Sequence, residues 1–264
     1  MAARAPDLQD ADGDAPLWLL LHELDDLSAA PLRRCLAPAA QAAGGQLLSV
    51  PAPALLHARH WSLRMDADGH TRTSLQLGPH RLAGHRLRAV LNRLAPPQTT
   101  GGHADAAYQQ QEWQAILAFW LASLPCPVLN AARPLALSGL QAPALRWRQL
   151  ASQAGLPAVA ESMALAIAQA RSRLLVLGRH CLAGPEARRV DAPLLQAWRR
   201  ALPSFAESLG LAMLEVWLVQ DGNGRWLLDC ADARPDLRHL DAPLQSALLD
   251  CMGLGSACAL EVCP

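Results

Sequence analysis

The sequence contains no lysine. All 23 positions in its combined lysine and arginine count are arginine. This absence excludes a lysine nucleophile, a lysine that forms a Schiff base, and the lysine that grips phosphate in a Walker loop. An arginine can bind an anion, but it keeps its proton near neutral pH and cannot act as a base or a nucleophile.

Charge and long apolar runs are also scarce. Charged residues make up 17% of the 264 residues and balance to a formal net charge of zero, so no overall field favours nucleic acid or an anionic membrane. No apolar run reaches the ~18 residues that a membrane-spanning helix needs. Residues 1–16 lack the apolar segment of a signal peptide, so we expect a disordered leader and a cytoplasmic protein.

Recognisable catalytic and metal-binding motifs are missing as well. The sequence has no G-x-S-x-G, H-E-x-x-H or P-loop pattern,. Seven cysteines, an odd number, give no C-x-x-C pair, although four of them crowd the C-terminal end: Cys230, Cys251, Cys258 and Cys263. We interpret these as buried or idle thiols, and we expect neither disulfides nor a bound metal or other cofactor.

The hydrophobic pattern predicts an α/β protein. Apolar strands at residues 17–21 and 46–50 flank a helical stretch, and this β-α-β order indicates a small parallel sheet,. Asp-Gly turns predict hairpins around residues 66–70 and 221–224,. The clearest helix is Tyr108–Leu124, whose apolar residues form one continuous stripe,. The order of these elements divides the chain, after the leader, into domains at residues 17–155 and 156–264.

Four pieces of the N-terminal domain occur in a distinctive order. They are the strand end Val90–Leu94, Tyr108 with Glu112 at the start of the Trp-rich helix, the segment Leu124–Asn130, and the run Trp147–Pro157. Together they resemble the pre-ATP-grasp domain that precedes the ATP-grasp body of glutathione-synthetase-like and RimK-like ligases, especially those of peptide-tailoring pathways. The resemblance implies a pre-ATP-grasp-like N-terminal lobe with a small parallel sheet.

Beyond residue 157 the resemblance is partial. Arg173–Gly184 is similar to a strand and hairpin of these ligases, and Leu209–Pro235 is similar to their last strand pair. That strand pair carries a Glu-x-Asn metal motif before a proline in the family. Here the corresponding stretch is Asp229-Cys230-Ala231, and an alanine offers no oxygen ligand to Mg²⁺. Asp229 and Asp232 are therefore only weak candidates for a remnant metal site, and solvated hairpin ends are the alternative.

The stretch from Gly155 to the end is too short for both lobes that sandwich ATP in this family. The resemblance implies that the glycine-rich phosphate loop, both phosphate-binding lysines and the adenine hinge are missing. A ligase that forms an acyl phosphate needs a metal ion and cations on the developing phosphate charge. We therefore expect a truncated, degenerate ATP-grasp relative with a reduced α+β C-terminal lobe and no catalytic residues.

Polar residues at predicted strand ends are the candidate ligand-binding residues. Asn92 and Arg93 end one strand and Asn130 ends another, at the edge where α/β sheets place ligands,. Glu112 joins them through the resemblance. Each residue has an ordinary structural alternative: a loop cap or surface ion pair for the strand ends, and a charge in the first helical turn for Glu112.

Three functions remain open. The sequence favours a non-catalytic binding or partner protein of a peptide- or amino-acid-tailoring pathway that holds a peptide or carboxylate. The alternatives are an ATP-dependent carboxylate–amine ligase, or a split half completed by another chain, and an enzyme of different chemistry that uses Cys or Asp. A lost lobe would expose sheet edges and helix faces. We therefore expect a homodimer or a complex with a catalytic partner, with Trp198 and Trp217 as apolar anchors.

Overall fold

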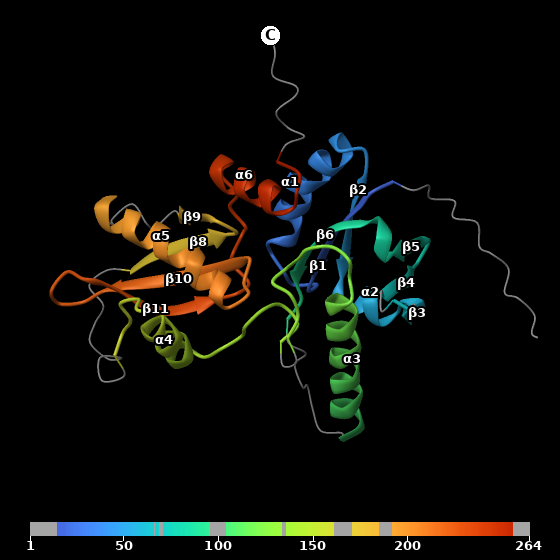
Figure 1. Ribbon diagram of the computed structural model, residues 1–264, viewed down its shortest axis with the longest axis horizontal. Helices are drawn as coiled ribbons and strands as arrows, with labels where there is room; N and C mark the ends of the chain where they lie inside the picture. The colour runs from blue at the N-terminus through green and yellow to red at the C-terminus, as the bar shows by residue number, and fades with distance from the viewer. Residues whose placement is uncertain are drawn as a thin grey trace, which may run out of the picture.

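The computed structural model describes residues 15–65, 67–68, 71–95, 104–133, 136–160, 171–184 and 192–255. Most of the expected leader, Cys258 and Cys263 lie outside the described residues. The α/β fold is confirmed: two lobes lie side by side, each built around a four-stranded sheet with helices against it (Figure 1). Among the described helices, none has the length and apolar character needed to cross a membrane.

The first lobe is built on a parallel sheet with the strand order β2-β1-β6-β7. The five residues Leu17–Leu21 of β1 are all buried, as expected for a central strand that is covered on both faces. Helix α1 makes the crossover from β1 to β2. The bounds are β1 Leu17–His22, α1 Ala29–Ala42, β2 Gln46–Pro51, β6 Leu87–Arg93 and β7 Val128–Leu129.

A small antiparallel sheet and a long helix extend the first lobe. The sheet has the order β3-β4-β5, and α3 packs one face against this part of the molecule through Leu117, Trp120 and Leu121. Trp61 of β3 meets the Trp120 ring edge-on at 5.7 Å between centroids. The bounds are α2 Ala52–Leu56, β3 Arg59–Met65, β4 Thr71–Leu77, β5 His80–Ala83, η1 Gly84–Arg86 and α3 Ala104–Ala122.

The second lobe is an antiparallel sheet with the order β11-β10-β8-β9. Alternate residues of β8 face opposite sides, as in any strand. Leu174 and Val176 join the core of the second lobe, whereas Leu175 and Leu177 join a core shared with β1 and α1. The bounds are α4 Ala144–Gln153, β8 Arg171–Leu177, β9 His180–Ala183, α5 Ala192–Ser208, β10 Met213–Gln220, β11 Trp226–Asp232 and α6 Ala242–Cys251.

Two helices tie the lobes together across the boundary expected near residue 155. Helix α4, which the sequence placed in the N-terminal domain, packs against β11, and its Trp147 is part of the core of the second lobe. Helix α6 returns to the first lobe and lies beside α1 (Figure 1). The indole Nε1 of Trp18 donates to the carbonyl of Met252 at 3.0 Å. The cores therefore do not divide where the order of elements does.

Candidate functional site

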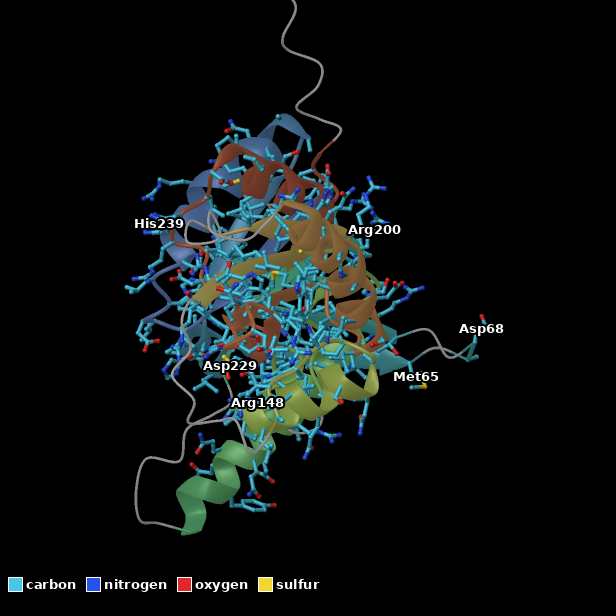
Figure 2. All side chains as sticks on the ribbon, turned by 90° about the vertical axis from the view of Figure 1, so that its left-hand side faces the viewer. Met65, Asp68, Arg148, Arg200, Asp229 and His239 are labelled. Atoms are coloured by element: carbon cyan, nitrogen blue, oxygen red, sulfur yellow. The ribbon has the colours of Figure 1, made fainter. Side chains whose placement is uncertain are left out.

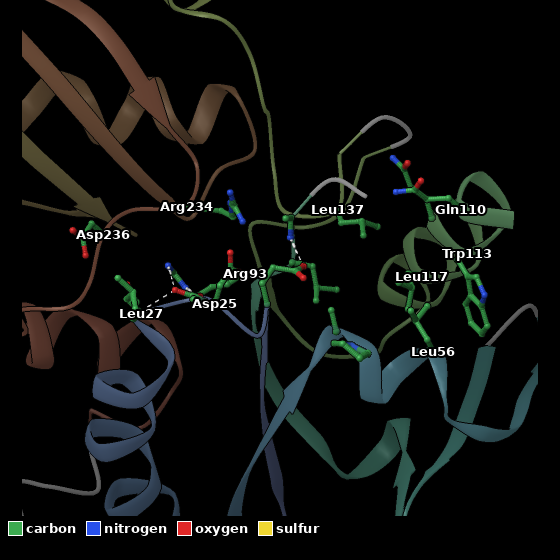
Figure 3. A pocket seen from close by; sticks show the side chains of 18 of the residues that line it. Asp25, Leu27, Leu56, Arg93, Gln110, Trp113, Leu117, Leu137, Arg234 and Asp236 are labelled. Atoms are coloured by element: carbon green, nitrogen blue, oxygen red, sulfur yellow. Dashed lines mark hydrogen bonds and ion pairs between the residues drawn. The ribbon is translucent and has the colours of Figure 1, made fainter. Parts of the chain in front are cut away.

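A cavity of about 1030 Å³ opens where the two lobes meet. Its floor is the carboxyl-terminal edge of the parallel sheet, with Glu23 and Asp26 after β1 and Arg93 at the end of β6. Figure 3 shows Trp113 and Leu117 of α3 on one side, and Arg234 and Asp236 from the loop after β11 on the other. Ligands of open α/β sheets commonly bind at this edge.

Arg93 is at the centre of a buried ion pair in the floor. Its Nε lies 2.7 Å from Oδ2 of Asp26, its Nη2 lies 3.1 Å from Oδ1, and its Nη1 donates to the carbonyl of Pro235 at 2.9 Å. The two side chains are only 4% and 12% exposed. Burial acts to raise the pKa of Asp26, but the hydrogen bond and charge of Arg93 outweigh it and hold this pKa below its usual value,.

Asp236 and Arg238 of the wall belong to a network of arginines and carboxylates that continues behind the wall to Arg173 and Glu215, which do not line the cavity. Nη1 of Arg173 lies 3.3 Å from Oε1 of Glu215 and 3.8 Å from Oδ2 of Asp236. Nη2 of Arg238 lies 2.6 Å from the same Asp236 oxygen. Burial raises the pKa of Glu215, although the backbone N–H of Asp236 and the charge of Arg173 oppose the shift. These acids are neutralised by arginines of the same chain.

Asn92 and Asn130 are fully buried and committed to the protein itself. The Asn92 amide nitrogen donates to the carbonyls of Asn130 at 3.1 Å and Leu137 at 2.5 Å. Asn130 bridges the lobes, since its Oδ1 accepts from the Met213 N–H at 2.8 Å and its Nδ2 donates to the carbonyls of Met213 and Ala233. Both residues stand at the predicted edge, but their polar atoms bind backbone.

The other two predicted ligand-binding residues differ from each other. Arg93 lines the cavity, as described above, whereas Glu112 is exposed and does not line it. Of the four predicted residues, the structure therefore brings only Arg93 to the cavity wall. Most of the lining was not singled out from the sequence, including Leu56, Trp113 and Arg234. Trp113 was visible in the stripe of the long helix, but no sequence signal marked Arg234.

The two weak metal candidates, Asp229 and Asp232, each have a partner within the protein. Asp229 pairs with Arg148, whose Nη2 lies 2.5 Å from Oδ1, and Figure 2 shows the two side by side at the meeting of α4 and β11. Asp232 accepts from the backbone N–H of Arg234 at 2.7 Å. Within the described part of the chain, no three His, Cys, Asp or Glu side chains are grouped closely enough to hold a metal ion.

The two predicted interface tryptophans occupy different environments. Trp198 is 3% exposed and packs in the core of the second lobe, so its ring is not available to a partner in this conformation. Trp217 is partly exposed, and the guanidinium of Arg173 lies 5.8 Å from its ring centroid. The arrangement is a cation–π contact.

Four of the five cysteines in the described part of the chain have raised thiol pKa values. Burial raises the pKa of Cys126, Cys230 and Cys251 to about 11 each and that of Cys181 to about 12. A thiol acts as a nucleophile through its thiolate, which these values suppress at neutral pH. These four thiols therefore give no support to a cysteine-based reaction.

No protein-family model and no curated protein matches this sequence, but solved structures match the fold. The macrocyclase MdnB from Microcystis aeruginosa MRC has a TM-score of 0.63 and 16% identity, covering 90% of this chain and 99% of that chain. MdnC, from the same organism and bound with the precursor peptide MdnA, has a TM-score of 0.62, 11% identity and the same coverage. A Chryseobacterium gregarium RiPP-associated ATP-grasp ligase, in complex with ADP and a leader and core peptide, has a TM-score of 0.62 and 11% identity, covering 90% and 96%.

These likenesses extend over both lobes and confirm the resemblance at the level of fold. The chain has an ATP-grasp-like α/β fold. A fold is compatible with many activities, so a function has to be argued from the side chains at the site.

Proposed function

We propose that this protein is a non-catalytic binding protein of a peptide- or amino-acid-tailoring pathway, and that it holds a peptide in the cavity between its lobes. The observation that carries the proposal is the composition of the cavity walls. Leu56, Trp113 and Leu117 form an apolar side, and the opposite side presents charged groups. A cavity with a large apolar surface and a few convergent polar groups is typical of ligand sites.

Solved structures with the same fold support a peptide as the ligand class. MdnC is described as bound with its precursor peptide, and the Chryseobacterium ligase as bound with a leader and a core peptide. A further structure, the ATP-grasp ligase PsnB, is complexed with a minimal precursor. Each of these proteins binds a peptide on this fold, which makes a peptide a reasonable occupant of the cavity described here.

The residues present do not fit ATP with Mg²⁺. The cavity is lined by four carboxylates (Glu23, Asp25, Asp26 and Asp236) and three guanidiniums (Arg93, Arg234 and Arg238), so its lining carries a net charge of −1. A triphosphate carries several negative charges and needs an excess of cations or a metal around it. The chain has no lysine, and Glu215 and Asp236 are already paired with arginine. The cavity lining therefore gives no support to a phosphoryl-transfer step.

A working ligase, or a split half completed by another chain, is the second candidate. The observation in its favour is the likeness to ATP-grasp ligases over nine-tenths of this chain. On this alternative a second protein would supply the cations and the phosphate loop. ATP binding by the isolated chain, and by the chain mixed with candidate partners, distinguishes the two functions.

Titration with ATP and Mg²⁺ is expected to show no saturation up to millimolar nucleotide, because the cavity lining repels a polyanion. Isothermal calorimetry of the purified chain measures this directly. GTP and ADP serve as controls for non-specific heats. A Kd on the order of micromolar, which corresponds to about −8 kcal/mol, would contradict the non-catalytic proposal and favour the ligase.

We also propose that the protein associates through the outer face of α3. Tyr108, Ile116 and Phe119 are 61%, 46% and 57% exposed, and helical spacing places them on one side, with the buried Leu117 across the helix from Tyr108. An antiparallel pairing of two copies, centred along the helix midway between positions 113 and 114, would bring Tyr108 of each copy to Phe119 of the other. This is the self-complementary arrangement of a two-fold dimer.

Light scattering after size-exclusion chromatography is expected to give a dimer that Phe119→Ser converts to a monomer. Leu145→Ser is the matched control, because Leu145 is an exposed leucine of α4, which packs against β11 of the second lobe. The wild type could instead be a monomer that forms a heterodimer with a catalytic protein of the same pathway. If Phe119→Ser also prevents that heterodimer, the outer face of α3 binds the catalytic protein and not a second copy. A monomer that binds neither would remove support for association.

A further inference from the structure

Arg234 is a cation of the cavity wall that forms no ion pair with the residues that the structure describes. Its Nε atom is buried and makes no hydrogen bond with any residue that the structure describes. The other two arginines of the lining are paired, Arg93 with Asp26 and Arg238 with Asp236. A guanidinium stays charged and directs five N–H donors outward. A buried donor that lacks an acceptor is costly, so the position of Arg234 indicates that an acceptor comes from a ligand.

The charges around the cavity define the kind of anion that Arg234 can take. Once the two ion pairs are counted, Arg234 remains on the side of the second lobe, and Glu23 and Asp25 remain on the side of the first. Glu23 also accepts the backbone N–H of Ala95 at 2.7 Å. A polyanion would be repelled by these two carboxylates, whereas a single carboxylate group needs only one guanidinium. A carboxylate is therefore favoured over a phosphate.

The wall across from Arg234 is apolar. Figure 3 shows Trp113 and Leu117 on α3, with Leu56 below them, facing the gap from the side opposite Arg234. A ligand that spans the cavity must therefore present a carboxylate at one end and a bulky apolar group at the other. Peptides that contain an acidic group next to Leu, Ile or Phe meet this requirement.

We infer that Arg234 binds the carboxylate of a peptide ligand while a neighbouring apolar side chain of that peptide packs against Leu56 and Trp113. The inference rests on the proposed function and names the chemical class of its ligand. Arg234 can take both oxygens of a carboxylate at once, which fixes the orientation of the peptide as well as adding affinity. Arg234 is a binding residue here, with no role in a reaction.

Three acetylated tripeptides, two with an amidated C-terminus and one with a free C-terminus, test this inference by calorimetry on the full-length protein. Acetyl-Leu-Glu-Leu-amide carries a side-chain carboxylate, acetyl-Leu-Gln-Leu-amide carries none, and acetyl-Leu-Gln-Leu with a free C-terminus carries only the terminal one. At least one acidic peptide is expected to bind about tenfold more tightly than the neutral peptide, the ratio that a charge-assisted hydrogen bond provides. The peptide that does so identifies the source of the carboxylate.

Arg234→Gln is expected to remove this preference, and Arg234→Lys to restore part of it. Arg146→Gln is the matched control, because Arg146 is an exposed arginine of α4 outside the cavity, and it should leave the preference intact. Equal binding of all three peptides, with no change in Arg234→Gln, would overturn the inference and leave the proposed function standing. Failure of every peptide to bind would overturn both. If inorganic phosphate binds as tightly as the acidic peptide, Arg234 is a phosphate-binding residue and the inferred preference for a carboxylate is wrong.

Discussion

Replacing Arg93 by methionine is expected to lower the free energy of unfolding at pH 7 by about 3 kcal/mol. Methionine keeps much of the volume of the arginine stem but leaves Asp26 without its cation and the carbonyl of Pro235 without its donor. Removing one member of a buried ion pair is far more damaging than removing both, because the remaining charge stays buried without compensation. Urea unfolding followed by tryptophan fluorescence measures the change.

The effect of Arg93→Met is expected to grow with pH. In the wild type the pKa of Asp26 is held below its usual value. The pair therefore stabilises the fold above about pH 4, the usual pKa of an aspartate, and this contribution is lost as the pH falls through the folded-state pKa. In the variant both effects of Arg93 are gone, and burial, the largest cause, is opposed only by the Ser28 N–H and by His22, so we expect the pKa of Asp26 to rise. Ionisation then opposes folding, so the difference between the two proteins is smallest near pH 3.

Two further variants complete this experiment. Asp26→Asn in the Arg93→Met background removes the buried charge and should recover much of the stability at pH 7, since an asparagine can still accept from the Ser28 N–H. Arg238→Met is the matched control, because its pair with Asp236 is 50% and 30% exposed, and an exposed pair contributes about 1 kcal/mol or less. An equal loss in Arg238→Met and Arg93→Met, independent of pH, would contradict the role assigned to the buried pair.

The elements that the sequence predicted are those encoded by local pattern. The buried run Leu17–Leu21, the Asp-Gly turn before Gly224 and the apolar stripe of α3 each depend on neighbours within a few residues, and the structure confirms them as β1, the β10–β11 hairpin and the helix Ala104–Ala122. The short elements β5 and α2 were missed, because four or five residues carry too little periodicity to be recognised.

The cavity lies at the sheet edge to which the sequence pointed, but most of its lining residues were not predicted. The rule that ligands bind beyond the carboxyl ends of parallel strands led to Asn92, Arg93 and Asn130, and the cavity does lie at that edge. The sequence could not show that Met213 and Ala233 of the second lobe would cover Asn130, since these residues are 83 and 103 positions away in the chain. Nor could it show that Trp198 would turn inward, because an amphipathic helix does not reveal which sheet it will cover.

Arg234 illustrates the same limit for the charged residues. In the sequence it stands between Asp232 and Asp236, a spacing that indicates local ion pairing. In the structure Asp232 accepts its backbone N–H, while Asp236 pairs with Arg238 and Arg173. Which arginine lacks an ion-pair partner depends on Arg173 of β8 and on the turn after Pro235. Only the fold brings these two segments together.

Replacing Asn130 by alanine is expected to cost about 4 kcal/mol of stability, the largest single effect we predict. The substitution leaves the N–H of Met213 and the carbonyls of Met213 and Ala233 without their partner in a buried site, and each orphaned group costs about 1–3 kcal/mol. Asn130 also has a positive φ of 55°, a conformation that asparagine tolerates better than alanine. Urea unfolding again provides the measurement.

Asn130→Gly separates the two contributions. Glycine adopts a positive φ without strain, so this variant loses the hydrogen bonds alone and should be about 1 kcal/mol more stable than Asn130→Ala. Asn223→Ala, in the exposed β10–β11 turn, is the control and should change stability by less than about 0.5 kcal/mol.

Because Asn130 joins β7 to both β10 and the end of β11, its loss should also let the lobes move independently. Peptide binding in the cavity between them should then weaken even where the variant remains folded. An Asn130→Ala protein as stable as the Asn223→Ala control would show that the shared core around Leu175, Leu177 and Trp18 holds the lobes together without this residue.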